Sequence, residues 1–202
     1  MATDPRKMTP QTGDRMTIDA YFQLDAPAYS TKYEYLNGAV RLMAGGSKEH
    51  DDIAFNIRAA LKQHFQSGPC SVQGSDMRVQ VSEQAYFFPD VTVSCDVADR
   101  RRGNKLIRSP RIVVEVLSPS TEKFDCTEKL LVYQACPTIA EIVLVSQFSP
   151  HVEVYHREEG ASGWLHTFYM QGQEVVLESI DVRLSLDEIY QGINFDEPLV
   201  EN

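Results

Sequence analysis

The chain has 202 residues, a formal net charge of −10 at pH 7 and a hydrophobic fraction of 43%. This length fits one domain, and no apolar run approaches the roughly 18 residues that a membrane span requires. The acidic charge argues against a dedicated high-affinity nucleic-acid binder, but it leaves a nuclease open because a carboxylate-rich metal site is itself negative. The polar beginning of the chain lacks the apolar core of a secretory signal, so we expect a cytoplasmic protein with no membrane association.

The four cysteines are spread along the chain, with no C-x-x-C pair among them. This spacing gives no support to a zinc knuckle. In a cytoplasmic protein cysteines stay reduced, and buried ones pack as small hydrophobes. We therefore expect free thiols at Cys70, Cys95, Cys126 and Cys136.

The first part of the chain predicts a tail, a short helix and a hairpin. Residues 1–16 are mostly polar with two prolines, and we expect them to be disordered. Thr17 is a suitable N-cap for a short helix over residues 17–24. Asn37-Gly38 then separates two strand-like runs, which is a strong signal for a tight β-hairpin.

A long amphipathic helix is predicted next. Ser47 is a suitable N-cap, and acidic residues in the first turn interact favourably with the helix dipole. Gly68-Pro69 ends this helix. Its apolar residues recur at helical spacing and predict the buried face: Ile53, Ile57, Ala60, Leu61 and Phe65.

Strand-like runs alternate with one further helix through the middle of the chain. The helix is predicted over residues 125–136 and ends at Pro137. The strand-like runs around it cover residues 71–81, 87–97, 111–118 and 139–146.

The C-terminal part of the chain predicts a meander of short strands, closed by a brief helix with Ser185 and Glu188 spaced as a capping box. The strands cover residues 151–160, 163–170, 174–179 and 181–185. The element order predicts an α/β fold, with a mixed sheet flanked by helices and this meander at its end. We expect one domain over residues 17–195 and an acidic tail over residues 196–202.

A carboxylate interrupts the most strand-like run of the sequence. Five of the six residues from Ile112 to Leu117 are aliphatic, and the sixth is Glu115. Alternation places Glu115 on one face with Val113 and Leu117, in a run whose two apolar faces are typical of a covered central strand. A buried carboxylate must be paired, protonated or bound to a cation. This stretch alone is equally compatible with a strand-end or ion-paired glutamate and with a metal ligand.

A second carboxylate, Asp90, begins another predicted strand in the stretch FFPDVTV. Pro89 lacks a donor and keeps Phe88 extended. Asp90 would share a face of the strand with Thr92 and Ser94. Taken alone, an aspartate in a turn before a strand is the simpler interpretation.

A lysine lies near the start of the predicted helix over residues 125–136. If Asp125 caps this helix and Glu128 completes a capping box, Lys129 falls at about the fourth helical position. The helix dipole mildly disfavours a lysine there, and nearby carboxylates would reverse that preference. A solvated lysine is the simpler interpretation of this position alone. Lys123 precedes the expected helix, and we expect it to be exposed.

Two carboxylates on neighbouring strands together with a lysine suit metal-dependent phosphodiester cleavage. Carboxylate oxygens are the hard ligands that Mg²⁺ prefers. The metal lowers the pKa of a bound water and offsets negative charge in the transition state, and a lysine ammonium can orient the attacking water. Asp90, Glu115 and Lys129 are therefore candidate catalytic residues, with Mg²⁺ or Mn²⁺ as the cofactor.

The ordered series YEYLNGAVRLM, SKEH, FFPDVTV and RIVVEVLSPST, followed by Asp125 and Lys129, resembles the Uma-two type of restriction endonuclease family. This family is a branch of the PD-(D/E)XK nuclease superfamily. The resemblance extends over residues 17–155. It implies a restriction-endonuclease-like core, metal-dependent hydrolysis of DNA, and a homodimer.

The resemblance also implies roles for individual residues. Asp90 and Glu115 would be metal ligands, and the carbonyl of Val116 would be a further one. The superfamily usually has a lysine two residues after this acid, where this sequence has Leu117. In this branch the lysine lies on the following helix, in the position of Lys129.

Two further residues match catalytic positions of the family pattern. Glu34 lies in the predicted hairpin. His50 opens the long helix, where it would bind phosphate or help to orient the metal site; an exposed polar residue in a first turn is the alternative. Asp125 is expected to be a helix cap first and a partner of Lys129 second.

A basic segment, RRRGNKLIRSPR at residues 100–111, stands out in an otherwise acidic chain. It is the predicted contact for the DNA phosphate backbone, through Arg100, Arg101, Arg102 and Lys105. A solvated connecting loop is the alternative. The sequence contains no recognisable base-reading motif.

Three hypotheses about function follow. The main one is a Mg²⁺-dependent DNA endonuclease. Leu117 in the usual lysine position, together with the acidic charge, leaves open a nuclease-like module that binds DNA or a protein without cutting it. The third is a structural protein in which Glu115 forms an ion pair.

Overall fold

The computed structural model describes residues 15–24, 31–43, 45–158, 160 and 163–196. Of the tail expected to be disordered, only Arg15 and Met16 are described, and of the expected acidic tail only Asp196. In the part of the chain that the structure describes, no helix is both long and apolar enough to cross a membrane.

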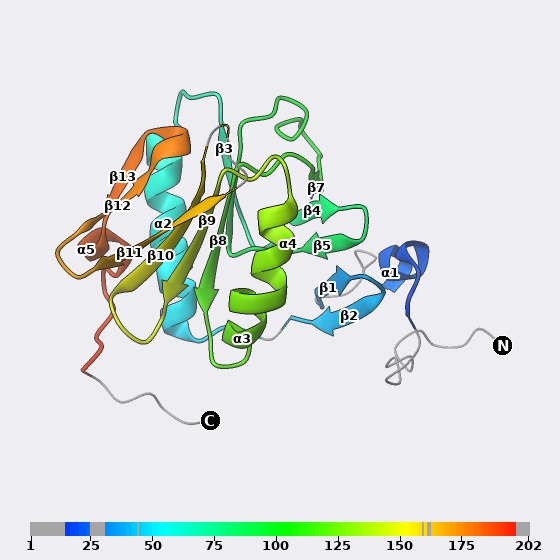
Figure 1. Cartoon of the computed structure of the whole chain (residues 1–202), viewed down its shortest axis with the longest axis horizontal. Helices are drawn as coiled ribbons and strands as arrows, with labels where there is room; N and C mark the ends of the chain where they lie inside the picture. The colour runs from blue at the N-terminus through cyan, green and yellow to red at the C-terminus, as the bar shows by residue number, and fades with distance from the viewer. Residues whose placement is uncertain (1–14, 25–30, 44, 159, 161–162, 197–202) are drawn as a thin grey trace.

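A mixed six-stranded sheet forms the centre of the molecule (Figure 1). Its order is β11-β10-β9-β8-β6-β3, in which β8 and β9 run parallel and the other neighbours antiparallel. The predicted mixed sheet is therefore confirmed, with β8 between two neighbours as expected of a central strand. The strands are β3 Ser71–Gly74, β6 Val91–Ser94, β8 Ile112–Leu117, β9 Glu141–Ser146, β10 His151–Arg157 and β11 Trp164–Met170.

A five-stranded sheet of order β2-β1-β5-β4-β7 packs with helix α1, Ile18–Leu24. The hairpin is confirmed: Asn37 and Gly38 have φ values of 49° and 90°, as a tight turn of this type requires. Two predicted strands are each divided between the sheets, because the chain crosses from one sheet to the other within them. The strands are β1 Tyr33–Leu36, β2 Ala39–Leu42, β4 Arg78–Ser82, β5 Ala85–Phe87 and β7 Leu106–Ile107.

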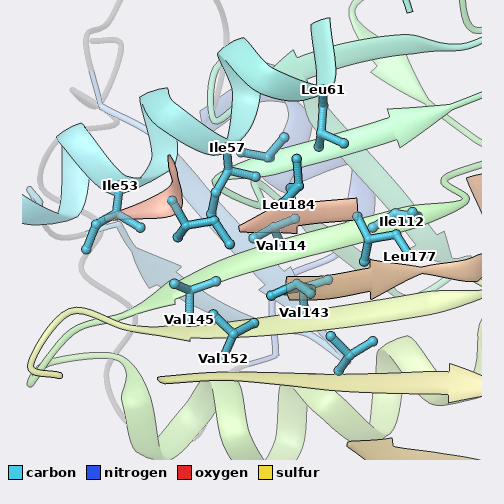
Figure 2. Packing of buried hydrophobic residues seen from close by; sticks show 14 of the residues in the cluster. Ile53, Ile57, Leu61, Ile112, Val114, Val143, Val145, Val152, Leu177 and Leu184 are labelled. Atoms are coloured by element: carbon cyan, nitrogen blue, oxygen red, sulfur yellow. The ribbon is translucent and has the colours of Figure 1, made fainter. Parts of the chain in front are cut away.

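The predicted long helix is α2, Lys48–His64, and it covers one face of the six-stranded sheet. Ser47 caps it as expected, since its hydroxyl accepts a hydrogen bond from the backbone N–H of His50 at 3.2 Å. Ile53, Ile57 and Leu61 are buried among aliphatic side chains of β6, β8, β9 and β10 (Figure 2). Each buried side chain of this size stabilises the fold by about 1.5–3 kcal/mol.

A shorter helix covers the opposite face, and its start differs from the predicted one. It begins as α3, Glu122–Phe124, passes through a π-helical turn, Asp125–Lys129, and ends as α4, Leu130–Ala135. The expectation that Asp125 caps the helix is wrong, because its own N–H already donates to the carbonyl of Thr121 at 2.9 Å. π turns occur frequently at functional sites.

The C-terminal strands do not form a single meander. β10 and β11 extend the central sheet, whereas β12, Glu174–Leu177, and β13, Val182–Ser185, form a separate pair. Apolar residues of this pair are buried in the cluster beneath α2, together with residues of the central sheet. A short 3₁₀ helix, Glu178–Ile180, joins the two strands, and α5, Leu186–Ile189, follows with Ser185 as its N-cap.

Two of the four cysteines form a disulfide, which corrects the expectation of four free thiols. Cys70 and Cys95 are bonded, while Cys126 and Cys136 are free. The pairing follows from the register of β3 and β6: Ser71 lies opposite Ser94, so the residues one step beyond the ladder also lie opposite each other. Spacing along the sequence does not reveal such a cross-strand pair.

Candidate active site

Asp90 and Glu115 come together because β6 and β8 are neighbours. Asp90 immediately precedes β6, and the register places Val91 opposite Val114. The backbone N–H of Val116 donates a hydrogen bond of 2.8 Å to Oδ2 of Asp90. The two carboxylates therefore lie next to each other where β6 begins and β8 approaches its end.

Glu115 is buried, with 4% of its surface exposed. As its place in the strand predicts, Val113 and Leu117 point to the same side, into the cluster beneath α4. Its Oε1 lies 2.9 Å from Nζ of Lys129 and accepts a 2.5 Å hydrogen bond from the hydroxyl of Tyr133. Burial raises the pKa of Glu115, and the ammonium of Lys129 opposes this shift.

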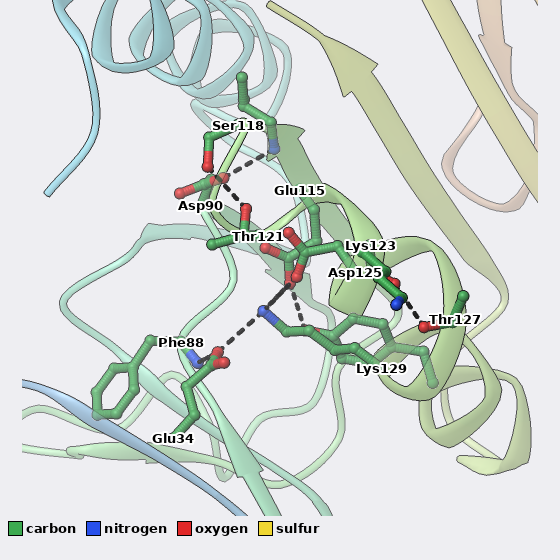
Figure 3. Close-up of polar contacts among 12 residues, drawn as sticks. Glu34, Phe88, Asp90, Glu115, Ser118, Thr121, Lys123, Asp125, Thr127 and Lys129 are labelled. Atoms are coloured by element: carbon green, nitrogen blue, oxygen red, sulfur yellow. Dashed lines mark hydrogen bonds and ion pairs between the residues drawn. The ribbon is translucent and has the colours of Figure 1, made fainter. Parts of the chain in front are cut away.

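Lys129 is buried among three carboxylates and is not the solvated lysine of the simpler interpretation (Figure 3). Its Nζ lies 2.9 Å from Oε1 of both Glu34 and Glu115, and 3.4 Å from Oδ1 of Asp125. Burial alone lowers the pKa of Lys129, but the charges of Glu115 and Glu34 outweigh burial and raise it. Lys129 is therefore a cation that helps to keep neighbouring carboxylates ionised.

Glu34 is the contribution of the five-stranded sheet to the site. It lies on β1, and its Oε1 contacts Nζ of Lys129 and also accepts a hydrogen bond of 3.2 Å from the backbone N–H of Phe88. Phe88 follows β5 and lies two residues before Asp90. The buried Glu34 side chain thus connects the hairpin, the crossing between the sheets and the helix that carries Lys129.

His50 lies beside Asp90 from the first turn of α2. Its Nε2 is 3.2 Å from Oδ2 of Asp90. Burial alone lowers the pKa of His50, but the hydrogen bond and charge of Asp90, with a hydrogen bond to the backbone of Val116, raise it overall. Gly46 leaves the space for this ring, because a Cβ at that position would lie 2.7 Å from Nδ1 of His50.

A cavity of about 390 Å³ opens onto these side chains. Asp90, Glu115, Lys129, Glu34, His50 and Asp125 all line it. All the residues that were predicted from the sequence to act in catalysis or metal binding therefore lie around this one cavity.

Comparison with known proteins identifies the family to which the chain belongs. The family model Uma2, described as "putative restriction endonuclease", matches residues 18–187. The chain belongs to the Uma2 family. Two Synechocystis sp. relatives, the uncharacterized proteins slr1290 and sll1609, are 37% and 30% identical over 165 residues, covering 81% of this chain and 86% and 92% of theirs.

A solved structure resembles this Uma2 fold. It is described as a putative nuclease belonging to DUF820 from Anabaena variabilis, and it matches with a TM-score of 0.72 over 87% of this chain and 97% of its own. The sequence identity is 15%, so this match shows the fold alone. The mixed α/β architecture expected from the element order is therefore confirmed as a nuclease-like fold.

The donor atoms at the Uma2 site fit a hard divalent cation. Among the described residues, no group of three or more His, Cys, Asp or Glu side chains is arranged to hold a metal ion. Mg²⁺, however, retains several waters and needs only one or two carboxylates from a protein. Asp90 and Glu115 would supply these, in a cluster of four carboxylates of which three contact Lys129 and the fourth, Asp90, contacts His50.

The basic loop does not join the site. It connects the end of β6 to the start of β8, whereas Asp90 lies before β6 and Glu115 in the second half of β8. The loop therefore lies at the other end of these strands (Figure 1). Asp99 braces it by accepting hydrogen bonds from the backbone N–H groups of Arg108 and Ser109 at 3.0 and 2.9 Å. Arg100, Arg101, Arg102 and Lys105 are thus not brought near the site.

Sequence reasoning missed Tyr133, Arg41 and Gly46. Tyr133 could have been found from helical spacing, since it follows Lys129 by four residues and so shares its face. Arg41 lines the cavity and lies over the ring of Phe124 at 4.0 Å. Neither this contact nor the room that Gly46 leaves for a ring is visible in the sequence, because both depend on how separate segments meet.

Proposed function

We propose that this protein is a metal-dependent endonuclease that hydrolyses DNA phosphodiester bonds. One observation carries the proposal: Asp90 and Glu115 meet on neighbouring strands at a cavity wall, with the buried ammonium of Lys129 in contact with Glu115. Membership of the Uma2 family supports a nuclease, and the nuclease-like fold agrees with it.

The proposed metal ligands are the carboxylates of Asp90 and Glu115 and the carbonyl of Val116. A bound Mg²⁺ or Mn²⁺ supplies a water of lowered pKa and offsets negative charge on the phosphate. Asp90 is oriented for this role by the N–H of Val116 and by His50. Glu115 is oriented by Tyr133 and Lys129.

In related nucleases a lysine lies two residues after the acid that corresponds to Glu115. In this chain Lys129 would take over the role of that lysine. Leu117 stands at that position and is buried in an apolar cluster. Instead, the helix that follows β8 places the ammonium of Lys129 beside Glu115. It does so on the side of β8 that Leu117 also faces. Lys129 favours the ionised form of Glu115 against the effect of burial, as metal binding requires, and its charge stabilises negative charge that develops on the phosphate. The pKa of His50 is raised, which favours the protonated ring next to Asp90.

Nicking of supercoiled plasmid tests this function. Wild type is expected to nick plasmid with Mg²⁺ or Mn²⁺ and not with EDTA, and Glu115→Ala to lose the activity. Glu128→Gln is a matched control, because Glu128 is exposed on the helix that carries Lys129. Equal cleavage by wild type and Glu115→Ala would show that Glu115 is not catalytic. Sedimentation of the purified protein tests the homodimer that belongs to this proposal.

A non-catalytic binding module is the second candidate. The observation that favours it is Leu117 in the usual lysine position, together with three carboxylates that already occupy the ammonium of Lys129. This candidate expects DNA binding without metal-dependent nicking, and equal DNA affinity for wild type and Glu115→Ala.

A further inference from the structure

A second cavity, of about 850 Å³, adjoins the candidate active site. Met43, Gly45, Gly46, His50 and Asp90 line both cavities. The two therefore meet at the pair formed by His50 and Asp90, and an extended ligand in the second cavity reaches the proposed metal ligands. We call this second cavity the α2 groove.

The α2 groove follows one side of helix α2. Lys48, Asp51, Phe55 and Arg58 line it, and their spacing of three and four residues places them on one side of the helix. A helix rises about 1.5 Å per residue, so this side extends for about 15 Å. Phosphates of one DNA strand follow each other every 3.4 Å or so along the axis. That spacing is the rise in a stacked duplex, and an unpaired strand is more extended, so the groove is long enough for at most about four nucleotides of one strand.

Lysines on the groove wall are held by ion pairs that a phosphate can replace. Nζ of Lys32 lies 2.6 Å from Asp76 and donates to the carbonyl of Ser75 at 3.0 Å. Nζ of Lys48 lies 2.6 Å from Asp52. Exposed pairs of this kind contribute at most about 1 kcal/mol, so they do not prevent the lysines from contacting a phosphate.

Arg58 is the third cation of the groove, and Gly74 leaves it room. A Cβ on Gly74 would lie 2.3 Å from Nη1 of Arg58. Gly74 does not have a positive φ, so its backbone does not require glycine, whereas a side chain there would displace the guanidinium of Arg58 from its present position. A guanidinium suits phosphate because it can donate two parallel hydrogen bonds. The groove lining also contains two carboxylates, Asp51 and Asp90, against these three cations.

Phe55 adds an exposed aromatic ring to the same groove. Its side chain is 58% exposed and lies outside the buried face of α2 formed by Ile53, Ile57 and Leu61. Aromatic rings beside a positively charged groove are the common way in which proteins bind single-stranded nucleic acid, through stacking of bases. Bases in a duplex are already stacked on one another, so Phe55 suits an unpaired base.

We propose that the α2 groove binds a DNA strand next to the scissile phosphate, with Lys32, Lys48 and Arg58 on its phosphates and an unpaired base on Phe55. The inference rests on the proposed function for the position of the scissile phosphate at Asp90. It makes single-stranded or locally unpaired DNA the preferred substrate. It also places the phosphate contacts in the α2 groove, whereas the sequence predicted them in the basic loop.

Fluorescence anisotropy with a labelled single-stranded oligonucleotide and its duplex, both in EDTA, tests the groove without cleavage. The wild type is expected to bind the single strand more tightly than the duplex. Phe55→Ala should weaken binding of the single strand by about five-fold or more and leave duplex binding unchanged. Arg58→Gln should reduce the slope of log affinity against log salt by about 0.7 on the single strand.

Gly74→Ala displaces the guanidinium of Arg58 without changing the net charge, so it should weaken binding in the same direction as Arg58→Gln. Lys123→Gln removes an exposed charge from α3, at a residue that lines neither cavity, and Arg101→Gln removes one from the basic loop. Both controls should bind like wild type. Unchanged binding by Phe55→Ala and Arg58→Gln, an equal loss in the controls, or no binding by wild type would each overturn the proposal.

Plasmid and oligonucleotide cleavage separate this proposal from the proposed function. DNA binding that depends on Phe55 and Arg58 without metal-dependent cleavage would refute the endonuclease and leave the groove standing. Cleavage that depends on Glu115 but is insensitive to Phe55→Ala and Arg58→Gln would refute the groove and leave the endonuclease standing.

Discussion

Replacing Lys129 by methionine removes the cation from the buried cluster while keeping a side chain of similar length. The ammonium contacts Glu34, Glu115 and Asp125, and only 3% of the Lys129 surface is exposed. Lys129→Met therefore leaves three buried carboxylates without this partner. Lys123→Met is the matched control, because Lys123 is exposed on the same helix.

Removing one partner of a buried ion pair costs about 3–5 kcal/mol. The expected loss for Lys129→Met is of this size, a large part of the 5–15 kcal/mol or so of an ordinary domain. A change of 1 kcal/mol shifts the melting temperature of a chain this long by about 2–4 °C. The melting temperature is thus expected to fall by about 6–20 °C.

The loss of stability caused by Lys129→Met should also depend on pH. Burial already raises the pKa values of Glu115 and Asp125, and loss of the ammonium raises them further, so the folded state holds more protons than the unfolded chain. Stability then falls as pH rises above the ordinary glutamate pKa of 4.5. The penalty of Lys129→Met is therefore smaller in acid than at neutral pH.

Urea unfolding at neutral pH and in acid measures these effects. The double variant Glu115→Gln with Lys129→Met should be less destabilised than the sum of the single changes, because each removes the other's unpaired charge. The reasoning would be refuted if Lys129→Met were as stable as Lys123→Met within about 0.5 kcal/mol. It would also be refuted if the stability loss of the double variant equalled the sum of the losses of Glu115→Gln and Lys129→Met.

Three further predictions concern the same site. Tyr133→Phe removes the donor to Glu115 and should cost about 1.5–3 kcal/mol in urea unfolding; no loss would show that this hydrogen bond is unimportant. Gly46→Ala should displace His50 from Asp90, slow nicking and lower the pKa of His50, which NMR titration of the ring measures; an unchanged pKa would contradict the contact. Metal affinity should rise with pH, because burial raises the pKa of Glu115 and only the ionised form binds metal; electron paramagnetic resonance of Mn²⁺ would show a flat profile if Glu115 were not a ligand.

The sequence predicted the local features of the site because they depend on few residues. Alternation along one strand was enough to place Glu115 with Val113 and Leu117 on a single face. The Asn37-Gly38 turn and the Ser47 cap were predicted for the same reason, since each has a short-range chemical signature. The nuclease-like fold followed from the element order and the family resemblance.

The environment of Lys129 could not be predicted in the same way. Its burial depends on the π turn, which shifts the helix register, and on Glu34, which arrives from another sheet. Asp125 was expected to cap the helix, yet it lies within the π turn. Such contacts are set by long-range packing, and no local pattern in the sequence reports them.

The basic loop and the cysteines show that composition and spacing do not report where a segment lies in the fold; the contact of the loop with DNA stays a prediction. The charges of residues 100–111 were conspicuous in the sequence, but the loop lies at the far end of β6 and β8 from Asp90. Cys70 and Cys95 are far apart in sequence and become neighbours only through the register of β3 and β6.

Isothermal titration calorimetry with Mg²⁺ tests the central claim most directly, namely that Asp90 and Glu115 hold a divalent metal ion. We predict that wild type binds Mg²⁺, that Asp90→Asn and Glu115→Gln lose this binding, and that the control Glu128→Gln retains it. Absence of Mg²⁺ binding by the folded wild type, or equal binding by Asp90→Asn, would contradict the account.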